Sequence, residues 1–235
     1  MGLKVEEFLK IGPGDVLSFV GAGGKSMLIH SIGRRLVNEG RKVLIAATRP
    51  FRPPEDEKPV VFLTDERRFE HLLPHLGEHG LLVVAPSEAE DGMLAGYPPR
   101  ELDTFLGVAD YLLVEAEDAG GASLPMPLRD RDAPDITTVL MMVAGLDAVD
   151  DDLEPEAMGA TLAAEEGLLR CRPDIEKRVL LLHKADRLKH RKIGARVAKA
   201  ALDALPASFP PPRLILTSLR DLMVPLEDRE SGDRE

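Results

Sequence analysis

Three glycines followed by a lysine and a serine are the residues of this chain that most clearly indicate chemistry. Glycines let several backbone N–H groups converge on one anion without Cβ clashes, and the N-terminus of a following helix favours negative charge. The run LSFVGAGGKSMLIH therefore predicts a phosphate-binding loop between a strand and a helix. The residues of this loop are Gly21, Ala22, Gly23, Gly24, Lys25 and Ser26.

Lys25 and Ser26 occupy the positions that contact a triphosphate and its metal in G-x-x-x-x-G-K-[ST]. We expect Lys25, as an exposed side chain, to neutralise the β- and γ-phosphates, and the Ser26 hydroxyl to bind Mg²⁺. Phe19 stands where the first glycine of that motif would be. The loop is therefore shorter than the motif's loop, or the chain leads into it in a different way. The alternative is a tight strand-to-helix turn that needs glycine but binds nothing. A dinucleotide motif, G-x-G-x-x-G, fails at its last position, Ser26.

Glu115 is the candidate acidic partner of this loop. It ends the buried run of DYLLVEAED, and parallel strands direct their carboxyl ends toward the ligand. We expect Glu115 to hold Mg²⁺ through water and, with Lys25, to serve catalysis. The alternative is an ordinary strand end that faces solvent.

The run VLLLHKAD resembles the base-reading N-K-x-D segment of GTPases, with His183 in place of asparagine. Asp186 could accept two hydrogen bonds from guanine, while the stem of Lys184 lies along the ring. The alternative is a helix start in which Asp186 caps the helix that follows.

Three histidines are spaced by four residues, which would align them as metal ligands on one helical face. We expect Pro74 and Gly77 to prevent that helix, so that His71, His75 and His79 lie on a solvated surface.

The elements that must position these residues alternate between strand and helix. Helical patterns cover 25–36, 162–169 and 193–205. Short apolar runs predict strands at 16–20, 43–47, 60–63, 81–84, 111–114, 138–143, 179–182 and 214–216. This order predicts an α/β fold of the P-loop NTPase-like, doubly wound type, with a mostly parallel sheet and helices on both faces.

Composition predicts one globular domain over 1–226 and a charged, frayed tail over 227–235. The formal net charge of −11 among 235 residues argues against a nucleic-acid partner. A single cysteine, Cys171, excludes an intramolecular disulfide and suits a reducing compartment. We expect a cytoplasmic protein without a membrane segment, because no apolar run approaches ~20 residues.

Together these segments resemble the YqeC family, described as selenium-dependent hydroxylase accessory proteins. VGAGGKS is similar to that family's phosphate loop, YLLVEAEDAGGASLPMP to its acidic segment, LLLHKAD to its L-L-N-K-x-D segment, and LILTSL to its closing strand. In the family a strand ends in several threonines, and Thr48 is the threonine that this chain keeps there. The chain departs from the family pattern at Glu117, Asp118, Pro125 and His183.

The resemblance implies a protein that binds ATP or GTP with Mg²⁺ and assists maturation of a molybdenum hydroxylase through a protein partner. Gly21, Gly23, Gly24, Lys25, Ser26, Glu115, Lys184 and Asp186 carry over as site residues. Two alternatives remain open. One is a scaffold or pseudo-enzyme without hydrolysis, and the other is a small-molecule kinase or other phosphoryl transferase.

Overall fold

A computed structural model gives the structure of the chain. It describes residues 4–21, 23–54, 59–64, 71–116, 133–147, 154–168, 175, 177–185, 188–205, 212–217 and 224–225. The chain divides into two compact units. The first contains Met1–Val20, Lys25–Asp118 and Arg131–Leu140, and the second contains Gly21–Gly24, Ala119–Asp130 and Met141–Glu235.

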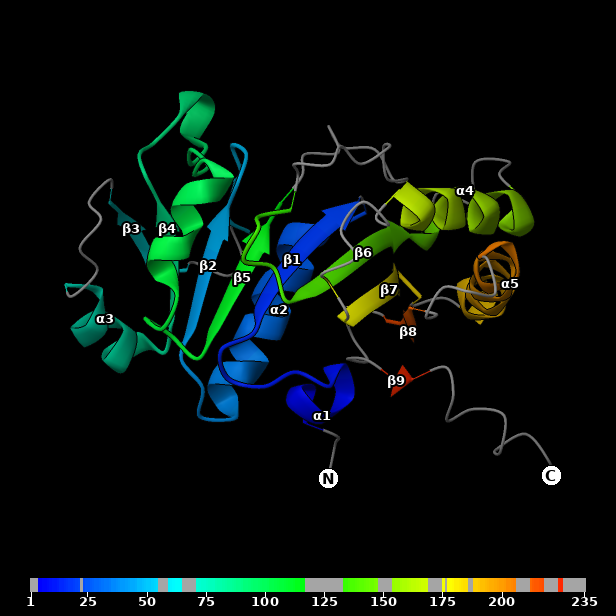
Figure 1. Cartoon of the computed structure of the whole chain (residues 1–235), viewed down its shortest axis with the longest axis horizontal. Helices are drawn as coiled ribbons and strands as arrows, with labels where there is room; N and C mark the ends of the chain where they lie inside the picture. Colours follow the sequence, from blue (N-terminus) through cyan, green and yellow to red (C-terminus); the bar gives the residue numbers. More distant parts are fainter. Residues whose placement is uncertain are drawn as a thin grey trace. The chain divides into compact units, whose positions relative to one another are not determined.

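The first half of the chain alternates strands and helices up to a buried strand that ends in an acid (Figure 1). Its elements are α1 (Val5–Leu9), β1 (Val16–Gly21), α2 (Lys25–Asn38), β2 (Val43–Ala47), β3 (Val61–Leu63), α3 (Leu72–His79), β4 (Leu81–Ala85), the 3₁₀ helices η2 (Glu90–Gly92) and η3 (Pro99–Phe105), and β5 (Tyr111–Glu115). The later elements are β6 (Val139–Gly145), α4 (Pro155–Leu168), β7 (Lys177–His183), α5 (Leu188–Ala204), β8 (Arg213–Leu216) and β9 (Val224–Pro225).

Sheet pairing within each unit is mostly parallel. In the first unit the strands follow the order β3-β4-β2-β5-β1, and each of these neighbouring pairs is parallel. In the second unit the order is β6-β7-β8-β9, in which β7 and β8 pair in parallel and β9 runs antiparallel to β8. The predicted α/β fold with a mostly parallel sheet is confirmed.

The core of the first unit consists of strands that are buried along their length. Every residue of β1 and of β2 is buried, which is typical of parallel strands covered on both faces. Helix α2 packs on β2, β4 and β5 through Leu28, Ile29, Ile32 and Leu36. At Gly33 an ideal Cβ would lie 2.7 Å from Leu81 Cδ1, so glycine permits this close packing.

Helix α3 corrects one expectation. Pro74 and Gly77 were predicted to prevent a helix, but Leu72–His79 is helical. Pro74 is the third residue of α3, where its backbone nitrogen needs no intrahelical partner. Gly77 costs only about 1 kcal/mol relative to alanine, which the buried Leu72 and Leu76 offset.

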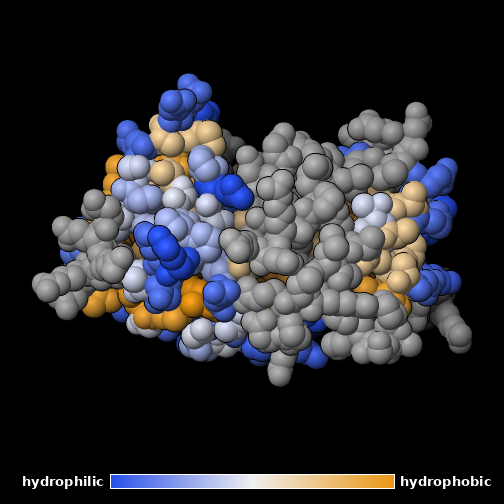
Figure 2. Space-filling model, turned by 45° about the horizontal axis from the view of Figure 1, so that its top comes forward, coloured by the Kyte–Doolittle hydropathy of each residue, from blue (hydrophilic) through white to orange (hydrophobic). Residues whose placement is uncertain are grey.

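The described surface is largely polar. Figure 2 shows one face on which hydrophilic residues predominate among those coloured, with smaller hydrophobic areas. Large apolar side chains that are exposed on the described part are Val61, Leu63, Leu73, Leu106 and Leu202. No helix in the described ranges has both the length and the apolar character needed to cross a membrane.

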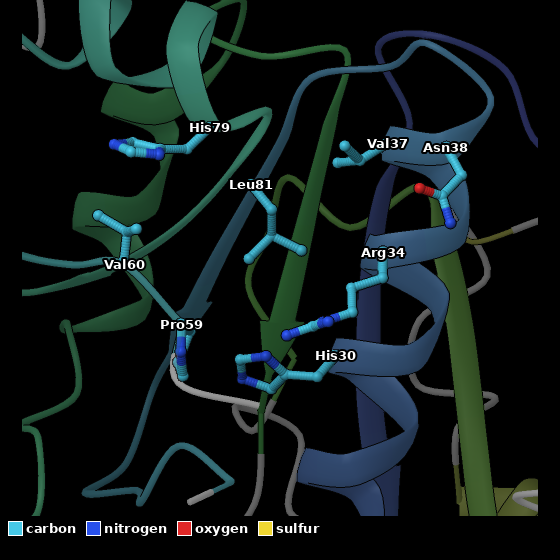
Figure 3. Close-up of a pocket in the computed structure, with 8 residues that line it drawn as sticks. All are labelled: His30, Arg34, Val37, Asn38, Pro59, Val60, His79 and Leu81. Atoms are coloured by element: carbon cyan, nitrogen blue, oxygen red, sulfur yellow. The ribbon is translucent and has the colours of Figure 1, made fainter. Parts of the chain in front are cut away.

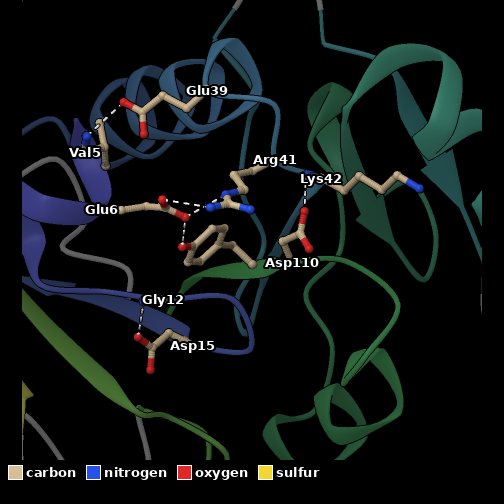
Figure 4. A network of polar contacts seen from close by, with 9 residues as sticks. Val5, Glu6, Gly12, Asp15, Glu39, Arg41, Lys42 and Asp110 are labelled. Carbon is tan, nitrogen blue, oxygen red and sulfur yellow. Dashed lines mark hydrogen bonds and ion pairs between the residues drawn. The ribbon is translucent and has the colours of Figure 1, made fainter.

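A polar network fastens α1 within the first unit (Figure 4). Tyr111 donates a hydrogen bond of 2.5 Å from its hydroxyl to Glu6, and Arg41 Nη2 donates one of 3.0 Å to the same carboxylate. The hydrogen bond from Arg41 holds the pKa of Glu6 below its usual range, while burial, with the Glu6 carboxylate, raises the pKa of Tyr111. The carboxylate is therefore ionised at neutral pH and the phenol stays protonated.

We predict that Tyr111→Phe lowers the free energy of unfolding by about 1.5 kcal/mol, because Glu6 loses one of its donors. Denaturation in guanidinium chloride measures the loss. In a Glu6→Ala background the same substitution should cost much less, because the acceptor is already gone. An equal loss in both backgrounds would contradict the assigned interaction.

Candidate functional site

The turn after β1 contains three glycines whose backbone geometry and close contacts favour glycine. Gly21, Gly23 and Gly24 have φ values of 94°, 95° and 108°, a region that other residues rarely adopt. A Cβ on Gly21 would lie 2.3 Å from the Val143 carbonyl oxygen, and one on Gly23 would lie 2.4 Å from the Gly145 nitrogen. The glycines of the predicted phosphate loop are thus required by backbone geometry and by contact with β6. Ala22 lies outside the described residues.

Gly145 and Asp147 belong to this part of the second unit, and neither is among the residues predicted from sequence. A Cβ on Gly145 would lie 3.1 Å from Gly23 Cα and 2.5 Å from Asp147 Oδ1. The signal that could have identified them is the run V-A-G-L-D, in which a glycine and an acid follow a buried strand. Glu115 was predicted from the same kind of pattern, an acid at the end of a buried strand.

Ser26 and Glu115 meet in the first unit, as the sequence predicts for residues of one metal site. Ser26 lies in the first turn of α2 and Glu115 is the last residue of β5. The Ser26 hydroxyl lies 3.1 Å from Glu115 Oε1 and 3.0 Å from Oε2. Residues that are 89 positions apart in the sequence therefore form one cluster of oxygen atoms.

This pair of residues fits Mg²⁺. Adjacent ligands of an octahedral Mg²⁺ with metal–oxygen distances of about 2.1 Å lie roughly 3 Å apart, and hydroxyl and carboxylate oxygens are hard ligands of the kind Mg²⁺ prefers. The spacing between Ser26 and Glu115 matches that separation. The same hydroxyl can hold the carboxylate by hydrogen bonding when no cation is bound.

Backbone pairing positions Glu115. It lies opposite Phe19 of β1 and Ala47 of β2 in the parallel ladders. Thr48 extends the second ladder, since its amide donates to the Glu115 carbonyl at 2.9 Å and its hydroxyl donates to the Ala116 carbonyl at 2.8 Å. Thr48, predicted as a nucleotide-binding residue, therefore supports the chain around Glu115 in this structure.

Lys25 is not exposed, contrary to the expectation from sequence. It is the first residue of α2, and only 5% of its surface is accessible. The side chain is therefore buried in the protein. A buried side chain has less conformational freedom left to lose when it binds an anion.

The predicted base-reading segment is described in part. Lys184 has a left-handed backbone, with φ of 65°, and its ammonium group forms an ion pair of 2.5 Å with Asp147. His183 is 1% exposed, and an ideal Cβ on Gly24 would lie 3.1 Å from its ring. His183 thus packs beside the glycine turn. Asp186, Glu117, Asp118, Pro125 and Cys171 lie outside the described residues.

A second group of possible metal ligands lies on α3. His75, Glu78 and His79 each have one ligand atom within 4.8 Å of the others. All three side chains are exposed, as expected for a solvated helix surface. His71 precedes this helix and is also exposed.

We predict that Gly23→Ala destabilises the protein by roughly 2 kcal/mol, because the new Cβ combines a positive φ with a backbone clash. Gly77→Ala is the matched control, since no atom lies within 4 Å of its ideal Cβ and α3 is helical there. The control should be neutral or stabilising. Chemical denaturation of both variants measures the difference, and an unchanged Gly23→Ala would refute the close approach to Gly145.

Comparison with known proteins assigns the chain to a family. "Uncharacterized protein YqeC" of Escherichia coli K12 is 32% identical over 116 residues, which are 48% of this chain and 44% of that protein, so the match spans less than half of the relative. Among solved structures, the hydrogenase maturation factor HypB of Archaeoglobus fulgidus is 13% identical with a TM-score of 0.45, covering 88% of this chain and 82% of that one. An apo GTPase of Pyrococcus abyssi is 13% identical with a TM-score of 0.44, covering 88% and 91%. The family model described as YqeC protein matches residues 17–159, more than half of the sequence, and the chain belongs to the YqeC family.

Proposed function

We propose that the protein binds a nucleoside triphosphate, ATP or GTP, together with Mg²⁺. The observation that carries this proposal is the hydrogen bonding of Ser26 to Glu115, at the start of the helix that follows the glycine turn. A turn that needed glycine for steric reasons alone would require neither a hydroxyl at the helix start nor a carboxylate at the end of β5. The arrangement instead brings together two hard oxygen ligands, one from the first turn of α2 and one from the end of β5.

The chemistry of each residue type suggests its role. Glycine amides at positions 21, 23 and 24 would donate to phosphate oxygens, and the start of α2 adds the favourable end of the helix dipole. Lys25 would neutralise charge between the β- and γ-phosphates. When bound, Mg²⁺ would bridge phosphate oxygens, and Ser26 and Glu115 would hold it, directly or through water.

Base recognition is assigned to Lys184 and Asp186 as part of the same proposal. The ion pair with Asp147 holds the Lys184 ammonium group in place and leaves its hydrocarbon stem as the part that could lie along a ring. His183 lacks the amide that asparagine provides at this position. We therefore expect a modest preference for guanine, with ATP also accepted.

The biological role that we propose is assistance in maturing a selenium-dependent molybdenum hydroxylase. The resemblance of the sequence to the YqeC family implies this role. In such a role the nucleotide state would be read by a protein partner in the cytoplasm, through loops that reorder around the triphosphate. Slow or absent hydrolysis without the partner is compatible with this switch.

We predict that Mg²⁺ strengthens binding of a non-hydrolysable triphosphate by roughly tenfold or more, because it offsets repulsion between Glu115 and the phosphates. Calorimetric titration with the GTP and ATP analogues, each with Mg²⁺ and with chelator, measures this effect. Ser26→Ala should lose most of the Mg²⁺ dependence and remain folded. Ser31→Ala, on the same helix, is the matched control and should behave as wild type.

Two results would count against the proposal. Equal affinity with and without Mg²⁺ in wild type would remove the metal role of Ser26 and Glu115. Absence of binding to either analogue in a folded protein would favour the scaffold without nucleotide chemistry.

A further inference from the structure

A cavity of about 310 Å³ lies in the first unit, beside α2 (Figure 3). One wall is α2, and the others come from the two residues before β3, the end of α3 and the start of β4. Its volume is at the lower end of the range for small-molecule sites. None of its lining residues belongs to the proposed nucleotide site, although α2 begins with Lys25 and Ser26.

His30 is a buried polar side chain that faces this cavity. It is 2% exposed and is one of the residues that line the cavity. Burial, with the nearby charge of Arg34, lowers the pKa of His30 to about 4, so the ring is neutral at physiological pH. A neutral imidazole keeps one N–H donor and one acceptor, with which it can bind a polar group in the cavity.

The polar lining favours negative charge. His30, Arg34 and Asn38 follow one another at intervals of four residues, which places them on one face of α2. Figure 3 shows the side chains of His30 and Arg34 extending from α2 toward Pro59. His79 approaches from α3, and no carboxylate is among the described lining residues. The described lining thus contains basic side chains and no acidic one.

The rest of the lining is apolar. Val60 and Leu81 lie on the side of the cavity that faces α2, and Val37 adds a third hydrocarbon surface. A site of this composition suits a molecule with one charged end and one apolar body, because small-molecule pockets combine apolar walls with a few convergent polar groups. A bare inorganic anion would leave the apolar walls unused.

We propose that this cavity is a binding site for a small organic anion. Its carboxylate or phosphate group is bound by the Arg34 guanidinium and the His30 ring, and its hydrocarbon body packs on Val60 and Leu81. The volume limits the ligand to about one ring or a short chain. Occupancy is independent of the phosphate loop, since the two sites share only the helix α2.

Benzoate and phenyl phosphate are suitable probes, with benzamide as the neutral counterpart of similar shape. We expect both anions to bind the full-length protein with dissociation constants on the order of 1 mM, and benzamide to bind far more weakly. The anion that binds more tightly shows whether the site prefers a carboxylate or a phosphate group. The signals of the His30 ring in proton NMR spectra should move with each anion and not with benzamide.

Arg34→Gln should weaken binding of either anion by roughly tenfold or more, because a charge-assisted hydrogen bond is lost. Arg35→Gln is the matched control, since this neighbouring arginine does not line the cavity. Lys25→Ala should leave binding of the probes unchanged, which separates this site from the nucleotide site. If Arg34→Gln fails to fold, the His30 signals of the wild-type protein decide the question.

The proposal is overturned if His30 does not respond to either anion, or if benzamide binds as well as benzoate. It is also overturned if Arg35→Gln weakens binding as much as Arg34→Gln, because attraction would then be a property of the basic surface. Loss of probe binding in a folded Lys25→Ala variant would assign the anions to the phosphate loop instead.

Discussion

The backbone contact between the glycine turn and β6 is the constraint on which the candidate site depends. Carbonyl and amide groups of Val143 and Gly145 lie so close to Gly21 and Gly23 that no side chain fits between them. The chain can therefore turn sharply after β1 and begin a helix within a few residues. Where α2 begins is fixed by that turn, and the position of Lys25 and Ser26 along the chain follows from it. A single added methyl group would disturb the loop and the helix start together.

Electrostatics explains why a cation is needed at such a site. A carboxylate about 4 Å from a phosphate oxygen is repelled by roughly 4 kcal/mol per unit charge at an effective dielectric constant of ~20. If a triphosphate binds as proposed, Glu115 would repel it unless a divalent ion lay between them. Its hydrogen bonds from Ser26 hold the carboxylate in one orientation, which lowers the cost of organising ligands when the ion arrives.

Periodicity and motif order predicted the strands and the long helices from sequence, because apolar runs in a parallel sheet are continuous and easily recognised. Ser26 and Glu115, the two residues predicted to bind a metal, lie in contact, because strand ends and helix starts meet at one edge of such a sheet. Three features were not predictable in the same way. The burial of Lys25 depends on tertiary packing. Helix α3 tolerates Pro74 because this residue lies in the first turn. The need for glycine at position 145 becomes visible only in the structure, where the backbone of Gly23 lies close to it. The cavity beside His30 joins residues from four segments and has no sequence signature.

The most direct test of the central claim is a map of the backbone amides that respond to nucleotide. Amide proton–nitrogen correlation spectra are recorded while a non-hydrolysable triphosphate with Mg²⁺ is added to the wild-type protein. The account predicts that the largest changes fall on Gly23, Gly24, Lys25 and Ser26, whose N–H groups would donate to phosphate oxygens, and that Glu115 follows when Mg²⁺ is present. Saturable binding that leaves these amides unchanged, with the responses on other elements, would contradict it.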